Sequence, residues 1–163
     1  MGKLLTKGCY KEVLDTEHTL LLKFKRFQGS GASLEVKAVL NDMGSDVKKK
    51  IGTTYIRIFP DKSAELSEIF VDPIFQDMGI GSRMLQFMID YLRDGQADKI
   101  FGTISADDVE KAIRFYAKNG FNIGNDKFSN IENFEVPLVK PQYPQFFELH
   151  KVEPITEEEF YRI

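Results

Sequence analysis

The sequence is poor in the residues that build disulfides and metal centres. Cys9 is its only cysteine, which excludes an intrachain disulfide and a cysteine-based zinc cluster and fits a reducing compartment such as the cytoplasm. Its two histidines, His18 and His150, lie far apart, so a histidine-built metal site is poorly supported. We therefore expect no metal and a cytoplasmic location.

Long apolar runs and a basic charge balance are also lacking. No run approaches the roughly 20 apolar residues that span a bilayer, and no signal-peptide core follows Met1. The formal net charge is -3, whereas nucleic-acid binding usually needs a basic surface. We find no internal repeat, low-complexity tract or linker in the 163 residues. This composition predicts one domain, 1–163, with neither a membrane nor a nucleic acid as partner.

Strand-forming residues dominate the first seventy positions. Segments rich in β-branched and aromatic residues are separated by turns such as Gly29–Gly31 and Asp61–Lys62. The predicted strands cover 17–28, 32–42, 51–60 and 64–71. Together they predict a meander of antiparallel strands.

The periodicity changes to that of a helix at Ile80. One helical face carries the apolar residues Ile80, Met84, Phe87, Met88, Tyr91 and Leu92, and Gly95 supplies the stop. A strand is predicted over 99–105. A second helix follows, with Val109, Ala112, Ile113 and Tyr116 on one apolar face, and it ends at Gly120. The last predicted strands, 121–123 and 145–153, flank a long polar loop over 124–144.

This order of elements predicts an α+β fold. We expect a mixed, mostly antiparallel twisted sheet of about six to seven strands, with a central βαβ unit and helices packed on it.

Two glycines, Gly79 and Gly81, stand between a predicted strand and the first helix. The sequence there lacks a P-loop, and the third glycine of a dinucleotide fingerprint is replaced by Met84. Glycine lets the backbone approach a ligand, and the first N–H groups of a helix favour an anion such as a pyrophosphate. A tight turn that needs glycine only for its backbone angles explains the same residues.

A wider stretch, roughly 64–121, resembles the GNAT superfamily of acyl-CoA-dependent N-acyltransferases. Two separated motifs match the order and spacing of the family signature. The matching residues are Val71, Pro73, Gln76-x-x-Gly79-x-Gly81, Ala112-Ile113-x-Phe115-Tyr116 and Asn119-Gly120-Phe121.

The resemblance implies an N-acetyltransferase. Such an enzyme transfers the acetyl group of acetyl-CoA, its co-substrate, to a primary amine by direct attack in a ternary complex. The acceptor would be a small molecule or an amine of a peptide or protein. One alternative is a catalytically silent GNAT-fold module that binds coenzyme A and serves a regulatory interaction. Another is an α+β interaction protein without a ligand.

The resemblance also implies where the coenzyme lies. The pyrophosphate would meet the loop residues Gln76, Asp77, Met78, Gly79, Ile80, Gly81 and Ser82. The pantetheine arm would pair with the end of the preceding strand, at Ile69, Phe70 and Val71. Arg83 would assist with the phosphates, whereas Asp77 replaces a residue that is more usually basic.

Three side chains are candidates for acid–base roles. Tyr116 occupies the position of a tyrosine that commonly protonates the leaving thiolate; a core aromatic in an apolar stripe is the alternative. Glu65, eleven residues before Gln76, occupies the position of a strand base in several GNAT members. Glu68 is an alternative base or a site for a cationic acceptor. The two glutamates have opposite parity on a strand, so at most one should face the cleft, and both are otherwise solvated charges. The Val71 N–H is our candidate to stabilise the oxyanion.

Two departures from the family pattern stand out. Val109 replaces a frequent asparagine, whose contact would be lost or shifted to Asp107 or Asp108. GNAT chains usually insert one or two helices between their first two strands, and here residues 28–31 join those strands directly. The resulting open cleft would suit a peptide amine, or be completed by segment 10–16, by the loop 124–144 or by a second copy in a homodimer.

Overall fold

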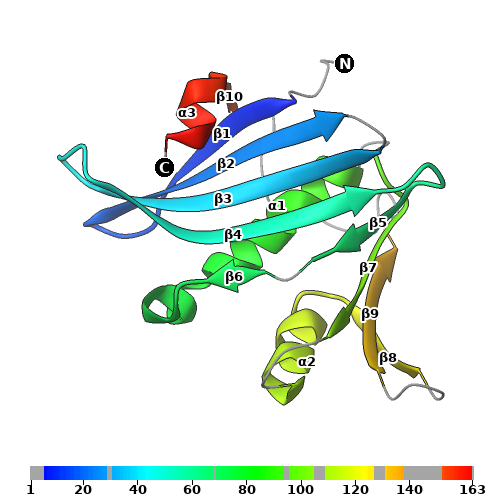
Figure 1. Ribbon diagram of the computed structural model, residues 1–163. Helices are drawn as coiled ribbons and strands as arrows, with labels where there is room; N and C mark the ends of the chain where they lie inside the picture. Colours follow the sequence, from blue (N-terminus) through cyan, green and yellow to red (C-terminus); the bar gives the residue numbers. More distant parts are fainter. Residues whose placement is uncertain are drawn as a thin grey trace.

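The described residues form one twisted sheet of ten strands (Figure 1). The computed structural model describes residues 6–28, 31–67, 69–93, 96–104, 109–126, 131–137 and 152–162. In chain order the elements are β1 (Lys7–Val13), β2 (His18–Gln28), β3 (Ala32–Asp42), β4 (Lys48–Ile58), β5 (Ser63–Leu66), β6 (Phe70–Val71), the 3-10 helix η1 (Pro73–Met78), α1 (Ile80–Arg93), β7 (Lys99–Ile104), α2 (Val109–Lys118), β8 (Asn122–Asp126), β9 (Ile131–Pro137), β10 (Glu153–Pro154) and α3 (Glu157–Tyr161). The neighbours in the sheet follow the order β10-β1-β2-β3-β4-β5-β7-β9-β8, and β6 pairs with β4.

The predicted meander and the predicted βαβ unit are both present. Strands β1 to β5 are successive antiparallel neighbours. β5 and β7 are parallel, and α1 lies between them in the chain. The α+β prediction is therefore confirmed.

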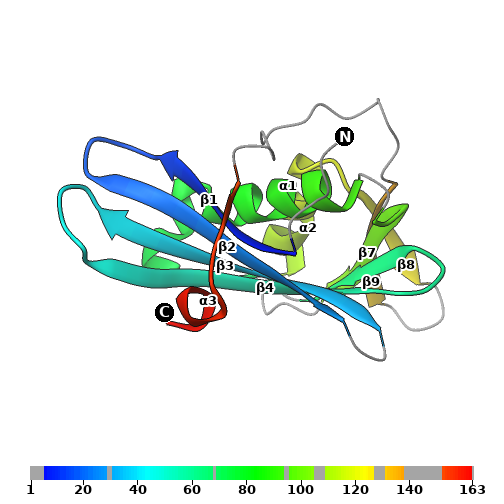
Figure 2. The same ribbon diagram turned by 90° about the horizontal axis from the view of Figure 1, so that it is seen from above.

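Helix α1 covers one face of the meander (Figure 2). Its predicted apolar stripe is buried, and the ring of Phe87 lies 5.3 Å from that of Phe24 on β2. Tyr91 lies 5.2 Å from the same Phe24 ring. Each fully buried aromatic or aliphatic side chain contributes about 1.5–3 kcal/mol, so this stripe anchors the helix whose first turn enters the candidate site.

Strand β1 corrects one prediction. Segment 10–16 was a candidate cover for the acceptor cleft, but Tyr10 lies inside β1 and its ring contacts Phe87 at 6.4 Å. The β1 sequence contains Gly8 and three charged residues, which local propensity does not favour in a strand. It is a strand because β2 pairs along one of its edges and β10 along the other.

Strand β9 corrects a second prediction. Part of the predicted loop 124–144 is this strand, in which Phe134 is paired with Gly102 of β7 and Ile123 of β8. Phe128, Tyr143 and most of the predicted strand 145–153 lie outside the described residues. The sheet thus has more strands than the six to seven expected, chiefly because of β1, β9 and β10.

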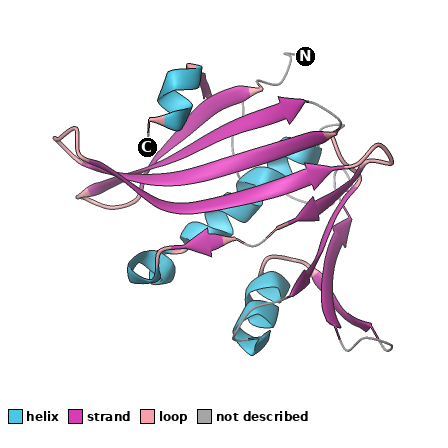
Figure 3. Ribbon diagram, in the orientation of Figure 1, coloured by secondary structure: helices cyan, strands magenta, loops and turns pink. Residues whose placement is uncertain are grey.

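The segment 152–162 crosses the edge of the sheet and places α3 on the face opposite α1 (Figures 2 and 3). Thr156 and Glu159 form a reciprocal capping box, which satisfies two N–H groups at the start of α3. Phe160 is fully buried, and the Lys37 ammonium lies 4.6 Å above its ring. The buried Lys23 ammonium donates to the Glu159 carbonyl at 2.9 Å, and its burial lowers the pKa of Lys23.

Candidate active site

The candidate site begins where two neighbouring strands separate. β5 and β7 are paired only as far as Glu65 and Phe101. The chain then continues into β6, which pairs with β4 instead of β7. β6 and β7 therefore diverge, as Figure 1 shows, and leave an opening in the sheet.

The register of the ladder shifts by one residue at this opening. Leu66 is paired with Ile56, and Phe70 with Thr53, so four steps along β5–β6 face three steps along β4. The shift follows the last pair between β5 and β7.

Backbone groups of Val71 point into the opening. The Asp72 N–H donates to the Ile51 carbonyl at 2.7 Å, so the preceding pair, Val71 and Gly52, belongs to the non-hydrogen-bonded type of an antiparallel ladder. The N–H and C=O of Val71 therefore point away from β4. The carbonyl accepts a hydrogen bond from Gln76 Nε2 at 3.1 Å, which holds the Gln76 side chain beside the opening.

The turn after β6 delivers the start of α1 to the same place. Asp72 caps η1 by accepting from the Ile74 N–H at 3.1 Å, and Pro73 follows it in the first turn. Gly79 ends η1 with φ of 74°, in the left-handed region that favours glycine. The Arg83 N–H makes the first helical bond, to the Gly79 carbonyl at 3.1 Å. The N–H groups of Ile80, Gly81 and Ser82 have no carbonyl four residues back within α1. Such N–H groups at a helix start are suited to receive an anion.

Helix α2 is held against this helix start by one asparagine. Asn119 donates to Ser82 Oγ at 3.1 Å and to the Phe115 carbonyl at 2.9 Å, and it accepts from Gln86 Nε2 at 3.1 Å. A Cβ on Gly81 would lie 3.3 Å from the Phe115 ring, so the glycine lets the two helices approach closely. The second glycine of the motif therefore serves helix packing.

A cavity of about 570 Å³ lies between the diverging strands, the turn and α2. The strand side is formed by Ser67, Ile69, Val71, Thr103 and Ile104. The turn side is formed by Gln76, Asp77, Gly79, Gly81 and Ser82. The α2 side is formed by Lys111, Ala112, Phe115, Tyr116 and Lys118. The two sequence motifs thus meet around one cavity.

Eight of the predicted site residues line this cavity. They are Ile69, Val71, Gln76, Asp77, Gly79, Gly81, Ser82 and Tyr116.

Four residues predicted to bind the coenzyme have side chains that do not line the cavity. Phe70 is 56% exposed on the other face of the sheet, because it alternates with the buried Val71. Ile80 is fully buried in the core, and Met78 packs partly against that core. The Arg83 guanidinium is hydrogen-bonded to the Glu12 carboxylate of β1 and does not line the cavity.

Tyr116 is packed as a core aromatic and also borders the cavity. It is only 8% exposed, with its ring 5.2 Å from Phe115 and 5.7 Å from Phe121, as a core aromatic would be. It also lines the cavity beside the opening in the sheet.

The predicted base occupies a different face. Glu65 is exposed and alternates with Ala64 and Leu66, whose side chains are buried on the α1 side. It does not line the cavity, but its strand pairing with Phe101 is the last before the strands diverge. Glu68 lies outside the described residues, as do Asp107 and Asp108. Val109 is exposed at the start of α2.

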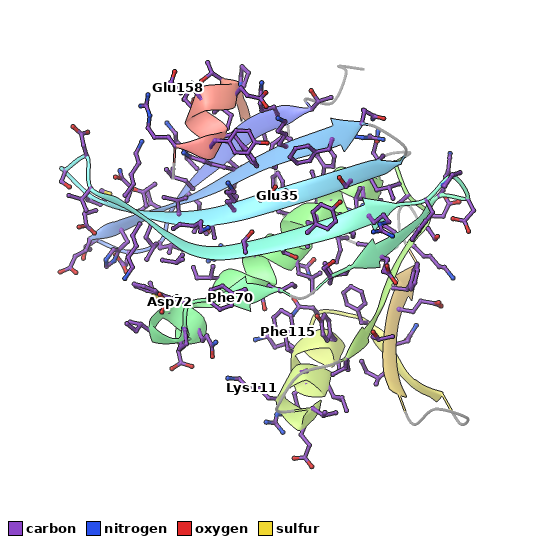
Figure 4. The ribbon with its side chains drawn as sticks, in the orientation of Figure 1. Glu35, Phe70, Asp72, Lys111, Phe115 and Glu158 are labelled. Atoms are coloured by element: carbon purple, nitrogen blue, oxygen red, sulfur yellow. The ribbon has the colours of Figure 1, made fainter. Side chains whose placement is uncertain are left out.

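The local sequence motifs did not identify two basic residues of the cavity, Lys111 and Lys118. Lys111 Nζ donates to Gln76 Oε1 at 3.1 Å and so connects α2 with η1 (Figure 4). Helical periodicity could have identified them. Lys111 lies four residues before Phe115 and Lys118 three after it, so all three side chains share one face of α2.

Nothing in the described residues indicates a metal or a thiolate nucleophile. No group of three histidine, cysteine or carboxylate side chains comes together among them. Cys9 is buried on the α3 side of the sheet beside Leu21 and Val39, and this burial raises the pKa of its thiol. In the same part of the chain, no helix is long and apolar enough to cross a membrane.

The model of the "Acetyltransferase (GNAT) family" matches residues 7–121. The chain belongs to this family. No curated protein sequence matched it. As a GNAT protein it shares its fold with solved structures of low sequence identity.

Three of these structures illustrate the likeness. An acetyltransferase of the GNAT family from Staphylococcus aureus is 19% identical, with a TM-score of 0.54 over 66% of this chain and 69% of that one. PaiA N-acetyltransferase from Thermoplasma acidophilum, in complex with coenzyme A, is 19% identical, with a TM-score of 0.53 over 64% and 60%. The ribosomal-protein-S18-alanine N-acetyltransferase from Escherichia coli is 22% identical, with a TM-score of 0.51 over 72% and 77%.

Replacing Gly79 with alanine should destabilise this GNAT protein through backbone strain alone. A Cβ at Gly79 meets no atom within 4 Å, but the φ of 74° costs an L-residue about 1–2 kcal/mol. Gly124→Ala is the matched control, because its Cβ also meets open space and its φ lies outside the left-handed region. Urea unfolding should show the loss for Gly79→Ala only, and equal stabilities would contradict this explanation of the turn.

Proposed function

We propose that the protein is an N-acetyltransferase that transfers the acetyl group of acetyl-CoA to a primary amine by direct attack in a ternary complex. The observation that carries the proposal is the continuity of the cavity. It extends from the helix start at Gly79, Gly81 and Ser82 to the diverging strand at Ser67 and Ile69. An elongated thioester with an anionic end and an apolar arm fits such a cavity.

The two ends of the cavity suit the two ends of the coenzyme. The unpartnered helical N–H groups and the positive end of the α1 dipole would bind the diphosphate. The pantetheine arm would lie along Ile69 and Val71, where backbone groups face the opening. The Thermoplasma acidophilum structure with coenzyme A supports this assignment through the shared fold.

The Val71 N–H is the proposed oxyanion donor. It points away from β4, beside the place where the thioester carbonyl would lie. As the amine nitrogen attacks that carbon, negative charge develops on the oxygen, and a fixed N–H stabilises it. Binding both substrates together supplies the remaining orientation.

Proton transfer would use one group on each side of the sheet. When the C–S bond breaks, Tyr116 donates its phenolic proton to the coenzyme A thiolate. Glu65, on the open face, takes the proton that the attacking amine releases, directly or through water. Cys9 is a poor candidate for an acyl carrier, since its thiol is buried and its pKa is raised. This favours direct transfer over a covalent intermediate.

The acceptor would approach from the face that carries Glu65. Only residues 29–31 separate β2 from β3, which are paired from Gln28 and Ala32 onward, so no helix lies between these two strands. On this face α3 packs over β2 and β3, and the site at Glu65 on β5 would take a small amine or the amine of a peptide or protein, with a second copy of the chain as a further way to complete the site. The Escherichia coli relative is named for an alanine of ribosomal protein S18, which supports a protein acceptor as one class to test.

A catalytically silent coenzyme A-binding module is the second candidate. It is favoured by Val109 at the usual asparagine position and by the absence of Glu65 from the cavity lining. Assays of binding and turnover distinguish it from the enzyme.

Coenzyme A should stabilise the folded protein. At a concentration 100 times its Kd, a ligand of the native state adds about 2.7 kcal/mol, which corresponds to a rise of several degrees in Tm. Differential scanning fluorimetry measures the rise. Gly124→Ala, which lies outside the cavity, should show the same rise, and an unchanged Tm in excess coenzyme would refute the proposal.

Tyr116→Phe should lower kcat with little change in the KM for acetyl-CoA. The ring and its packing remain while the proton donor is lost, and general acid catalysis typically contributes about 10²-fold or more. Thiol release measures the rate. Tyr161→Phe, an exposed tyrosine on the opposite face, serves as control and should retain full activity. Equal rates for Tyr116→Phe and the parent would assign Tyr116 to the core alone.

Glu65→Gln should lower kcat near neutral pH and recover as pH rises. At high pH the acceptor amine is already neutral, so the base is no longer required. Glu135→Gln is the matched control, an exposed carboxylate two strands away and paired with Lys99 at 3.4 Å. A pH–rate profile identical to that of the parent would exclude Glu65. Coenzyme binding without turnover on any amine would favour the silent module.

A further inference from the structure

The cavity reaches the face of the sheet that carries Glu65. Ser67 and Thr103 both line the cavity and are exposed, and they form its mouth on this face. Ser67 lies two residues after Glu65, and Thr103 lies two residues after Phe101, the strand partner of Glu65. The Ser67 N–H donates to the Tyr55 carbonyl at 2.9 Å, so the ladder with β4 continues to this residue. Glu65 therefore lies about 7 Å along the strand from the mouth.

Arg57 lies directly opposite Glu65, on β4. Residues opposed in this way have Cβ atoms about 5 Å apart on the same face of the sheet. Both side chains are exposed, yet they form no ion pair with each other. The Arg57 guanidinium lies instead 5.9 Å from the centre of the Phe59 ring. Two opposite charges thus stand next to each other near the mouth of the cavity without a direct contact.

Neighbouring cations on this face have carboxylate partners, whereas Arg57 has none in the described part of the chain. Lys37 Nζ lies 4.0 Å from Glu35, and Lys99 Nζ lies 3.4 Å from Glu135. The one printed contact of the Arg57 guanidinium is with an aromatic ring. Stacking of this kind orients a guanidinium and leaves its N–H groups, whose fork matches a carboxylate, available to a ligand.

We propose that the acceptor is an amine that also carries a carboxylate, such as an amino acid, and that Arg57 binds this carboxylate. The inference rests on the proposed function, because it needs the acceptor nitrogen at the mouth of the cavity. One guanidinium matches the single negative charge of the carboxylate, and it repels an acceptor with a second ammonium. The chemical step is the same for such an acceptor. The new N–C bond replaces the C–S bond, the amine proton passes to Glu65, and Tyr116 protonates the thiolate.

Thiol release with matched acceptors tests the inference. The panel holds ω-amino acids from glycine to ε-aminocaproate, their carboxamides, and diamines of equal length. In the longer members the carboxylate is several bonds from the amine, so the basicity of the nitrogen hardly differs between acid and amide. The parent should show a kcat/KM roughly tenfold higher for the best acid than for its amide, and the lowest value for the diamine.

Substitutions at Arg57 should change this order. Arg57→Gln should raise the KM for the acid to that for the amide and leave the amide unaffected, because only the acid loses a charged contact. Arg57→Glu should reverse the order and favour the diamine. Arg114→Gln is the matched control. Arg114 is exposed on α2 and does not line the cavity, so this variant should keep the order of the parent.

Several outcomes would overturn the inference. If the parent acetylates acids and amides with equal kcat/KM, no carboxylate is recognised, and the proposed function stands. If Arg57→Gln lowers the rates for acid and amide equally, Arg57 supports the strand or Glu65 and is not a ligand of the acceptor. If coenzyme A binds but no amine of any class is acetylated, the proposed function fails, and this inference fails with it.

Discussion

The geometry of the site depends on a change of neighbour along the segment formed by β5 and β6. Its first part, β5, hydrogen-bonds to both β4 and β7, whereas its continuation, β6, remains with β4. A sheet strand that loses one neighbour exposes a row of backbone donors and acceptors. Here that edge borders a cavity, and the Val71 N–H, which points away from β4, lies on the side where a ligand would be bound.

The first turn of α1 and the end of β6 are both held in place by packing around this opening. The buried stripe of α1 sets the direction of its first turn, and Asn119 attaches α2 to that turn through Ser82. Rigid elements therefore surround the cavity on three sides. Such a framework suits a reaction in which orientation of two bound substrates supplies much of the rate.

Local patterns in the sequence were sufficient to predict the meander, the α1 stripe and the glycine turn. Each depends on residues that are neighbours in the chain or on one helix face. The partner of Arg83 could not be predicted in this way, because Glu12 is 71 residues away and lies on a strand that itself exists only through its pairing. The position of Glu65 relative to the cavity could not be predicted either, because it depends on where β5 stops pairing with β7, a contact between segments far apart in the chain. Helical periodicity places Lys111 on the same face as Phe115, but it predicts a site residue only once Phe115 is known to face the cavity.

The attachment of residues 152–162 has a consequence for the order of folding during synthesis. β1, among the earliest described residues to leave the ribosome, finds its outer neighbour only in Glu153 and Pro154, and Lys23 meets the Glu159 carbonyl later still. Until then the nascent meander carries an unpaired border strand, and the Lys23 ammonium remains exposed to water. Completion of the sheet is thereby deferred to the end of translation of this region.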